Sequence, residues 1–235
     1  MPLRAQTLLL TLALTTCALA QDPLKTLPDN YTRVLDNPTV EVIRAHYGPH
    51  EKIPVHDHSS LSTVFVYLSD SGQVRIDHAE PGEKPVSILR PPTTTGAFRV
   101  NEGAAERHSI ENLGDTPSDF LRIELKNVTL HLPEAFRGKA PKSLATSSDT
   151  VEFTNPSLQV ERIICAGPAA CPVASSPFPS LLVAFTAASL VNPTEQPNRL
   201  ASGSILWFPA SQSATLIPNG SPAHILRILF PSPTP

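Results

Sequence analysis

The sequence has few charged residues and no excess of positive charge. Among its 235 residues, 18 Lys and Arg stand against 21 Asp and Glu, so the formal net charge is −3 at pH 7. A protein that binds nucleic acid through bulk charge needs a basic surplus to neutralise phosphates. The composition therefore predicts a protein without a nucleic-acid partner.

Glycine is also scarce, whereas proline is abundant: the chain has 10 Gly and 26 Pro. Ordinary proteins contain about 5% proline, roughly half of this content, and proline inside a helix removes a hydrogen bond and clashes with the preceding turn. Hydrophobic residues make up 40% of the chain, too many for a disordered protein. We therefore expect a compact, mainly β protein with one large or two small domains.

Long apolar runs are lacking except near the N-terminus. Residues 1–20 have a positive head at Arg4, an apolar run over Leu8–Leu14 and a small-x-small pattern ending at Ala20. This pattern is typical of a secretory signal peptide. A lipoprotein modified at Cys17 or a retained anchor is the alternative, although the run is shorter than the roughly 20 residues that span a membrane. We expect a secreted or periplasmic protein whose mature chain has no membrane span.

Cysteine is rare, with three in the chain, and Cys17 lies in the predicted signal peptide. The remaining two, Cys165 and Cys171, are six residues apart. In an oxidising compartment this spacing predicts a disulfide that closes a small loop. Two free thiols or half of a metal site are the alternatives, but no His or further Cys lies nearby in the sequence to complete four ligands.

Two parts of the chain resemble each other. Residues 37–44 read Asn-Pro-Thr-Val-Glu-Val-Ile-Arg, and residues 155–162 read Asn-Pro-Ser-Leu-Gln-Val-Glu-Arg. Self-similarity of this kind predicts an internal duplication. Further matched segments are 96–100 with 203–207, Asn112 with Asn219, and 121–123 with 226–228.

Each copy has the pattern of β-strands. Residues 40–44 alternate between apolar and polar side chains, and residues 63–68 are β-branched and aromatic, as in a strand buried on both faces. Strands at this spacing without helices between them indicate a sandwich or barrel. Residues 132–149, in which 133–136 could begin a helical turn, are expected to link two domains. Other expected strands are 73–77, 85–89, 96–100 and 120–125, and the tail from Pro231 is expected to be loose.

The sequence His56-Asp57-His58 stands out among the eight histidines. Residues two apart on a strand point to the same face, so both imidazoles would project together. Two convergent neutral imidazoles are half of a site for a transition metal. The alternative is a pair of surface histidines on an edge strand.

A second motif, His108-Ser-Ile-Glu-Asn112, follows about fifty residues later. A His-x-His pair followed by His-x-x-x-Asn resembles the two motifs of the cupin superfamily, and the repeat makes the chain resemble a bicupin. The resemblance implies an all-β fold of two small antiparallel barrels of the double-cupin, jelly-roll type, arising from duplication. It implies an N-terminal cupin domain over residues 21–131 and a degenerate C-terminal cupin domain over residues 150–235.

By the same resemblance, His56, His58 and His108 would bind a divalent transition metal: iron, zinc, manganese, nickel or copper. Asn112 would have a structural role. The chain departs from the family in lacking the usual Glu ligand after the His pair. Glu106, two residues before His108, is a candidate to replace that carboxylate or to orient a ligand, unless it is a solvated surface acid.

The second copy tests this interpretation. Ala174, Ser176 and Thr215 match His56, His58 and His108 in our sequence alignment, so all three imidazoles are absent together. Packing alone would not require their joint loss. We therefore expect metal in the first domain and none in the second.

Three functions are compatible with these patterns. Three His ligands would leave positions for a substrate and dioxygen, which favours a metal-dependent oxygenase that acts on a small molecule; an isomerase or lyase would use the metal as a Lewis acid. The second is a non-catalytic exported module that binds a small ligand, and the third is a metal-free barrel with a vestigial His pair. No sequence motif identifies a catalytic residue, although Tyr67 and Glu106 are candidates for a general base. A homodimer is compatible with the resemblance, but no residue specifies one.

Overall fold

The computed structural model describes residues 22–192 and 196–231. The predicted signal peptide and the tail residues 232–235 therefore lie outside the described residues. One short helix, α1 (Pro23–Thr26), precedes a series of antiparallel strands. Within the described ranges, no helix has the length and hydrophobicity needed to cross a membrane.

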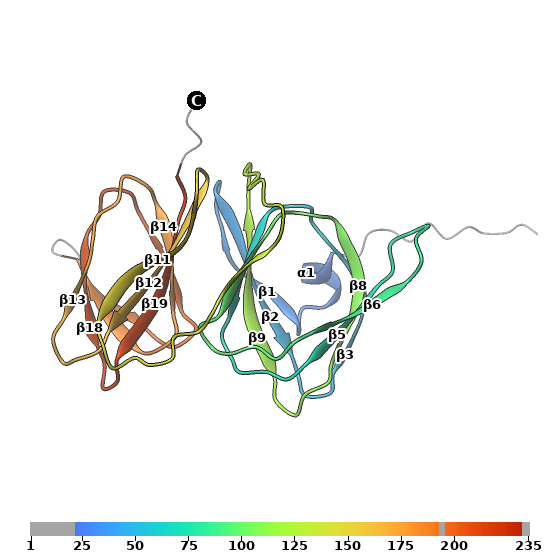
Figure 1. The fold of residues 1–235 in the computed structure, drawn as a ribbon, viewed down its shortest axis with the longest axis horizontal. Helices are drawn as coiled ribbons and strands as arrows, with labels where there is room; N and C mark the ends of the chain where they lie inside the picture. The colour runs from blue at the N-terminus through green and yellow to red at the C-terminus, as the bar shows by residue number, and fades with distance from the viewer. Residues whose placement is uncertain (1–21, 193–195, 232–235) are drawn as a thin grey trace, which may run out of the picture.

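The strands form two barrels that lie side by side (Figure 1). The first contains β1 (Tyr31–Asp36), β2 (Val40–Tyr47), β3 (Lys52–His58), β4 (Thr63–Tyr67), β5 (Val74–His78), β6 (Val86–Arg90), β7 (Phe98–Asn101), β8 (Glu106–Asn112), β9 (Ser118–Leu125) and β10 (Phe136–Gly138). The second contains β11 (Ser148–Asn155), β12 (Leu158–Cys165), β13 (Cys171–Val173), β14 (Ser180–Ala184), β15 (Ala188–Val191), β16 (Asn198–Leu200), β17 (Ile205–Phe208), β18 (Ala214–Pro218) and β19 (Ala223–Leu229).

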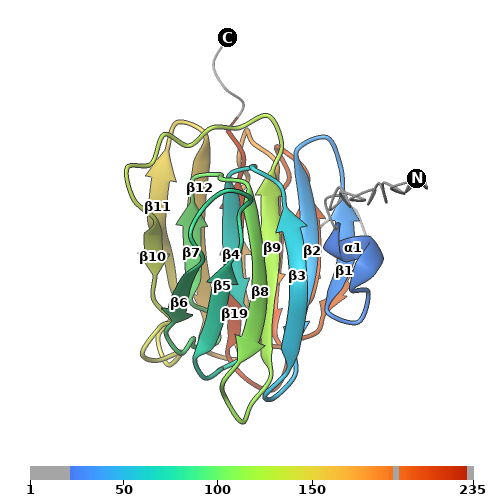
Figure 2. The same ribbon diagram turned by 90° about the vertical axis from the view of Figure 1, so that its right-hand side faces the viewer.

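Each barrel consists of two sheets. In the first, the sheet β1-β2-β9-β4-β7-β10 lies behind the sheet β3-β8-β5-β6, which faces the viewer in Figure 2. In the second, the sheet β11-β12-β19-β14-β17 packs on the sheet β13-β18-β15-β16. The all-β class and the two antiparallel barrels expected from the sequence are thus confirmed.

The largest hydrophobic core lies between the two barrels. Strands such as β4 are buried on both faces, so Val64 and Val66 point away from their own barrel and belong to the same cluster as Leu181 and Val183 of β14. Two smaller clusters fill the barrel interiors. The six-stranded and five-stranded sheets therefore form the interface between the two barrels (Figure 1).

The sheet register repeats from one barrel to the other. Val42 pairs with Ile123 in the first barrel, and Val160 pairs with Ile228 in the second. Gly96 and Gly203, which the sequence comparison also matched, both adopt positive φ, at 87° and 77°. The paired positions support the internal duplication.

The segment expected to be a linker contributes a strand to the first barrel. Residues 136–138 form β10, which pairs with β7, and residues 133–135 form no helical turn. Phe136 packs against Phe98, with 5.8 Å between ring centroids. Gly138 lies so close to Phe98 that a Cβ atom there would meet its ring at 2.0 Å. The apolar side chain at Phe136 and the absence of one at Gly138 explain why this short strand docks here.

A disulfide joins Cys165, the last residue of β12, to Cys171, the first residue of β13. The bond closes a loop with a sequence separation of 6. It braces the point where the chain crosses from one sheet of the second barrel to the other.

Candidate metal centre

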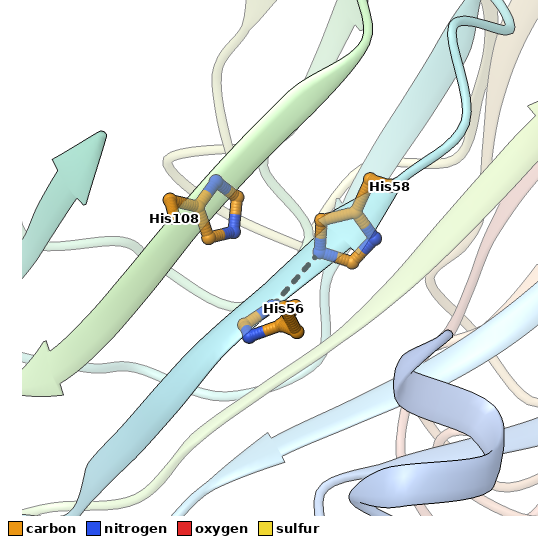
Figure 3. A group of neighbouring side chains, drawn as sticks. All are labelled: His56, His58 and His108. Carbon is orange, nitrogen blue, oxygen red and sulfur yellow. Dashed lines mark hydrogen bonds between the residues drawn. The ribbon is translucent and has the colours of Figure 1, made fainter. Parts of the chain in front are cut away.

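His56, His58 and His108 converge inside the first barrel (Figure 3). His56 lies opposite His108 in the pairing of β3 with β8, and His58 lies opposite Glu106. His56 is 0% exposed and His108 is 6% exposed. Two neighbouring strands therefore present all three imidazoles to one enclosed region.

An irregularity in β3 brings the His pair to the inner face. Ile53 and His56 are both buried although they are three residues apart, and strict alternation would place them on opposite faces. The register of β3 against β8 shifts between these two residues. Such a bulge reverses the direction of the side chains that follow it.

The distances suit a single metal ion. Nε2 of His56 lies 3.1 Å from Nε2 of His58, and the ligand atoms of the three histidines lie within 4.8 Å of one another. Two imidazole nitrogens that are each about 2.1 Å from an ion and at right angles to each other are about 3 Å apart. The cluster therefore fits a transition metal with small ring rotations.

Hydrogen bonding leaves nitrogen atoms of the cluster available. Nδ1 of His56 lies 2.8 Å from the carbonyl oxygen of Pro54, to which it donates, so Nε2 carries the lone pair. Nδ1 of His108 is buried and has no hydrogen-bond partner among the described residues. Buried polar atoms are usually paired, because an unpaired one loses its hydration without compensation. No hydrogen bond from the described residues therefore occupies the ring of His108, which remains available to a metal.

The surroundings keep the three imidazoles neutral, which is the form that binds metal. Burial lowers the pKa of His56 and lowers that of His58 far below its usual range. Burial, followed by the neighbouring His56, His78 and the positive Arg122, lowers the pKa of His108 to about 3. The site therefore needs no deprotonation step at neutral pH before it binds a cation.

Tyr31, which sequence analysis did not single out, completes one side of the cluster. Its hydroxyl lies 2.8 Å from Nε2 of His56 and 2.9 Å from the hydroxyl of Tyr47. Burial raises the pKa of both tyrosines, so they remain phenols. Tyr31 lies on β1, and no local motif marks it, because the contact depends on the packing of strands 25 residues apart.

The two residues proposed beside the cluster both line the same cavity, which has a volume of about 90 Å³. Glu106 lies 3.5 Å from the guanidinium of Arg122. The guanidinium of Arg90 lies over the ring of Tyr67, 5.5 Å from its centroid. Glu106 is thus an ion-pair partner rather than a solvated acid, and its role beside a metal stays a prediction, as does that of Tyr67.

A fourth imidazole, that of His78, lies next to the cluster. His78 on β5 pairs with His108, and their ring centroids are 5.7 Å apart. Its Nδ1 lies 3.2 Å from Glu80. His46 and His50, by contrast, form exposed contacts with aspartates outside the cavity.

In the structure, the second-barrel positions that match His56 and His108 lie one residue earlier in the chain than our sequence alignment placed them. Val173 pairs with Ala214, in the place where His56 pairs with His108 in the first barrel. The bulge in β3 accounts for the shift of the position matched to His56, and the pairing of β13 with β18 moves the position matched to His108 from Thr215 to Ala214. Thr215, which we had matched to His108, lies on the exposed face of β18. The corrected positions still carry no histidine, and apolar side chains fill this interior.

Asn112 has the structural role that its motif implied. Its buried side-chain amide donates to the carbonyl oxygens of Gly48 at 2.8 Å and Thr116 at 2.9 Å. Asn219, matched to it in sequence, is exposed and bonds to Ser189. The amide therefore connects the loops that follow β2 and β8 in the first barrel, and Asn219 does not make the equivalent hydrogen bonds among the described residues of the second.

Neither a protein-family model nor a curated protein sequence matches the chain. Its structure is similar to AerE from Microcystis aeruginosa, with a TM-score of 0.58 and 12% identity over 86% of this chain and 97% of that one. It is also similar to a salicylate 1,2-dioxygenase from Pseudaminobacter salicylatoxidans, with a TM-score of 0.53 and 14% identity over 82% of this chain and 71% of that one.

A third similar structure is a cupin 2 conserved barrel domain protein from Leptotrichia buccalis, with a TM-score of 0.51 and 14% identity over 85% of this chain and 88% of that one. At such identities the likeness concerns the fold, and function must be argued from the site. The duplicated barrels, the inward-facing histidines and these similarities agree: the chain has the cupin fold, with two barrels in one polypeptide.

Proposed function

We propose that the protein is a metal-dependent oxygenase that acts on a small molecule in the cavity of the first barrel. The observation that carries this proposal is the convergence of His56, His58 and His108, whose ligand atoms lie within 4.8 Å of one another inside the first barrel. The structural similarity to a dioxygenase supports the reaction class. The metal is a divalent transition ion such as iron, zinc, manganese, nickel or copper.

A transition metal bound by three imidazoles supplies Lewis acidity and, for iron or copper, electron transfer, with coordination positions left for other ligands. The protein contributes position and environment. The Pro54 carbonyl fixes the ring of His56, and the hydroxyl of Tyr31 holds a proton 2.8 Å from Nε2 of that ring. The aromatic side chains of Phe65, Tyr67 and Phe120 line the cavity.

We also propose that the protein is exported to a periplasmic or extracellular compartment. The signal-like pattern of residues 1–20 supports this location. The Cys165–Cys171 disulfide supports it independently, because disulfides persist mainly in oxidising compartments.

Oxygen uptake tests the reaction class. The protein reconstituted with Fe²⁺ should consume dioxygen when a panel of small organic compounds is supplied, and His108→Ala should abolish this uptake. His46→Ala, which alters an exposed histidine outside the cavity, is the matched control and should retain it. Ligand binding that survives His108→Ala, without turnover in either protein, would instead identify a non-catalytic binding module.

A further inference from the structure

Two arginines in the wall of the cavity, Arg90 and Arg99, have no carboxylate partner among the described residues. Nε of each is buried and makes no hydrogen bond with any residue that the structure describes. Arg90 donates to the hydroxyl of Ser118 at 2.8 Å and lies over Tyr67. Arg99 lies over the ring of Phe65, 4.7 Å from its centroid. The groups in direct contact with both guanidiniums are therefore neutral, and the positive Arg137 and Arg122 oppose the longer-range attraction of Glu106 for Arg99.

The third arginine of the cavity shows the usual arrangement. Arg122 lies 2.7 Å from Glu124 and 3.5 Å from Glu106, so two carboxylates balance its charge. Removing a charge from water without a counter-charge is costly, and proteins normally pair such groups. Arg90 and Arg99 therefore leave the cavity with positive charge that a bound anion would neutralise.

The same two arginines also line a surface cleft of about 470 Å³, together with Arg137 and Lys139. Within the described part of the chain, no acidic side chain lines this cleft. The whole chain has a net charge of −3, so the positive charge here is a local feature. Arg90 and Arg99 thus stand between a positive cleft and the histidine cavity, a placement that attracts anions towards the site.

The second barrel has leucine at both positions. Val74 pairs with Arg90 and Asn112 in the first barrel, and the matching Ala188 pairs with Leu200 and Pro218. Leu200 is buried in the core of the second barrel. The repeated fold therefore does not require an arginine at this place.

The strand pairing around Phe65 likewise places a leucine of the second barrel where the first barrel has Arg99. In the first barrel Phe65 pairs with Arg99 on one side and Arg122 on the other. In the second barrel Leu182 matches Phe65 and pairs with Leu206 on one side and Arg227 on the other. The arginine that is paired with carboxylates is present in both barrels, whereas the unpaired arginines occur in the barrel that has the histidines.

We propose that Arg90 and Arg99 bind the carboxylate of a small organic acid whose apolar body lies against Phe65, Tyr67 and Phe120. A guanidinium presents a planar pair of donors that matches a carboxylate. The aromatic walls suit a compact hydrophobic body, and the histidine cluster lies at the same cavity. This inference rests on the proposed function in that it names the substrate class of that site.

Calorimetry on the metal-free full chain tests the inference, because a bound metal would itself attract carboxylates. The probes are benzoate, pyruvate, the uncharged benzamide and inorganic phosphate, all at constant ionic strength. We expect at least one carboxylate to bind, benzoate to bind at least tenfold more tightly than benzamide, and phosphate to bind more weakly than the carboxylate. Equal binding of benzoate and benzamide, tighter binding of phosphate, or no binding of either carboxylate would overturn the inference.

Leucine variants locate the binding site. Arg90→Leu and Arg99→Leu introduce the residue that the second barrel has at each position, and each should weaken carboxylate binding at least tenfold. Arg99→Gln, which keeps a polar side chain, provides a second variant if the leucine disturbs folding. Arg33→Leu, at an exposed position of β1 outside the cavity, is the control and should bind as the wild type does. Unchanged binding in well-folded Arg90 and Arg99 variants would contradict the inference.

The outcomes separate this inference from the proposed function. Carboxylate binding that depends on Arg90 and Arg99 in a protein that never takes up metal would refute the proposed enzyme and retain the anion site. Metal uptake and oxygen consumption without carboxylate selectivity would retain the proposed enzyme and refute the anion site.

Discussion

Tyr31 shows how single side chains define the environment of the cluster. Its hydroxyl lies between Nε2 of His56 and the hydroxyl of Tyr47, and all three groups are buried. A neutral phenol in this position can donate to the imidazole in the absence of metal and turn towards Tyr47 when the nitrogen binds an ion. Tyr31 therefore interacts with the cluster by hydrogen bonding to His56 and is not itself a metal ligand in this account.

We predict that Tyr31→Phe lowers the free energy of unfolding by about 1 kcal/mol, the usual net value of one lost hydrogen bond. The variant should still bind metal, because the three imidazoles remain. Urea denaturation and elemental analysis measure the two quantities. Tyr47→Phe, which removes the outer hydroxyl, is the comparison. Loss of metal in Tyr31→Phe alone would show that the phenol is itself a ligand.

The three histidines could be identified from the sequence because two lie in one strand and the third lies in a recognisable motif. The other residues of the cavity could not. Tyr31, His78 and Arg99 come from strands that are distant in the chain, and only the sheet order places them around one cavity. The buried, unpaired nitrogen atoms are also properties of packing, which a sequence does not display.

At the scale of strands, hydrophobic patterning predicted the positions of β2, β4, β5, β6, β7 and β9 to within a few residues. It did not predict β10, which is too short for a periodic pattern. It also placed the second-copy equivalents one residue away, because nothing in the residues between Ile53 and His56 marks the bulge and nothing in the sequence of β18 marks its register. Register depends on both strands of a pair, so it is visible only once their pairing is known.

Glu102, just after β7, connects three segments of the first barrel. Its carboxylate accepts hydrogen bonds from the hydroxyl of Ser62 at 2.7 Å, the amide of Leu132 at 3.0 Å and the amide of Leu130 at 3.3 Å. Burial opposes ionisation, but these hydrogen bonds outweigh it and lower the pKa of Glu102 to about 2. The ionised carboxylate therefore stabilises the start of the crossing to the second barrel.

The stability that Glu102 provides should depend on pH. Because its pKa in the folded protein is lower than in the unfolded chain, its contribution is complete above the unfolded value and disappears as the pH falls towards 2. We expect Glu102→Gln to be less stable than the wild type in urea at pH 7, with the difference shrinking between pH 5 and pH 3. Glu134→Gln, at an exposed position, should show no such change. A difference that is constant over this range would contradict the assignment.

At the scale of the whole molecule, two barrels with one ancestry have different interiors. The first contains imidazoles, phenols and guanidiniums, whereas apolar side chains fill the second. The second barrel also forms half of the largest core, and Arg44 of the first barrel donates to the carbonyl oxygen of Gly203 in the second. The arrangement indicates a division of roles, in which the second barrel stabilises the sheet that carries one wall of the cavity.

Metal content is the measurement that tests this account most directly. Elemental mass spectrometry on untagged protein comprising residues 21–235, expressed with iron and zinc in the medium, should find close to one metal ion per chain. His56→Ala/His58→Ala should contain none, because it loses two of the three imidazole ligands. Metal absent from the wild type even after reconstitution, or retained at the same level in the double variant, would contradict a metal centre at these histidines.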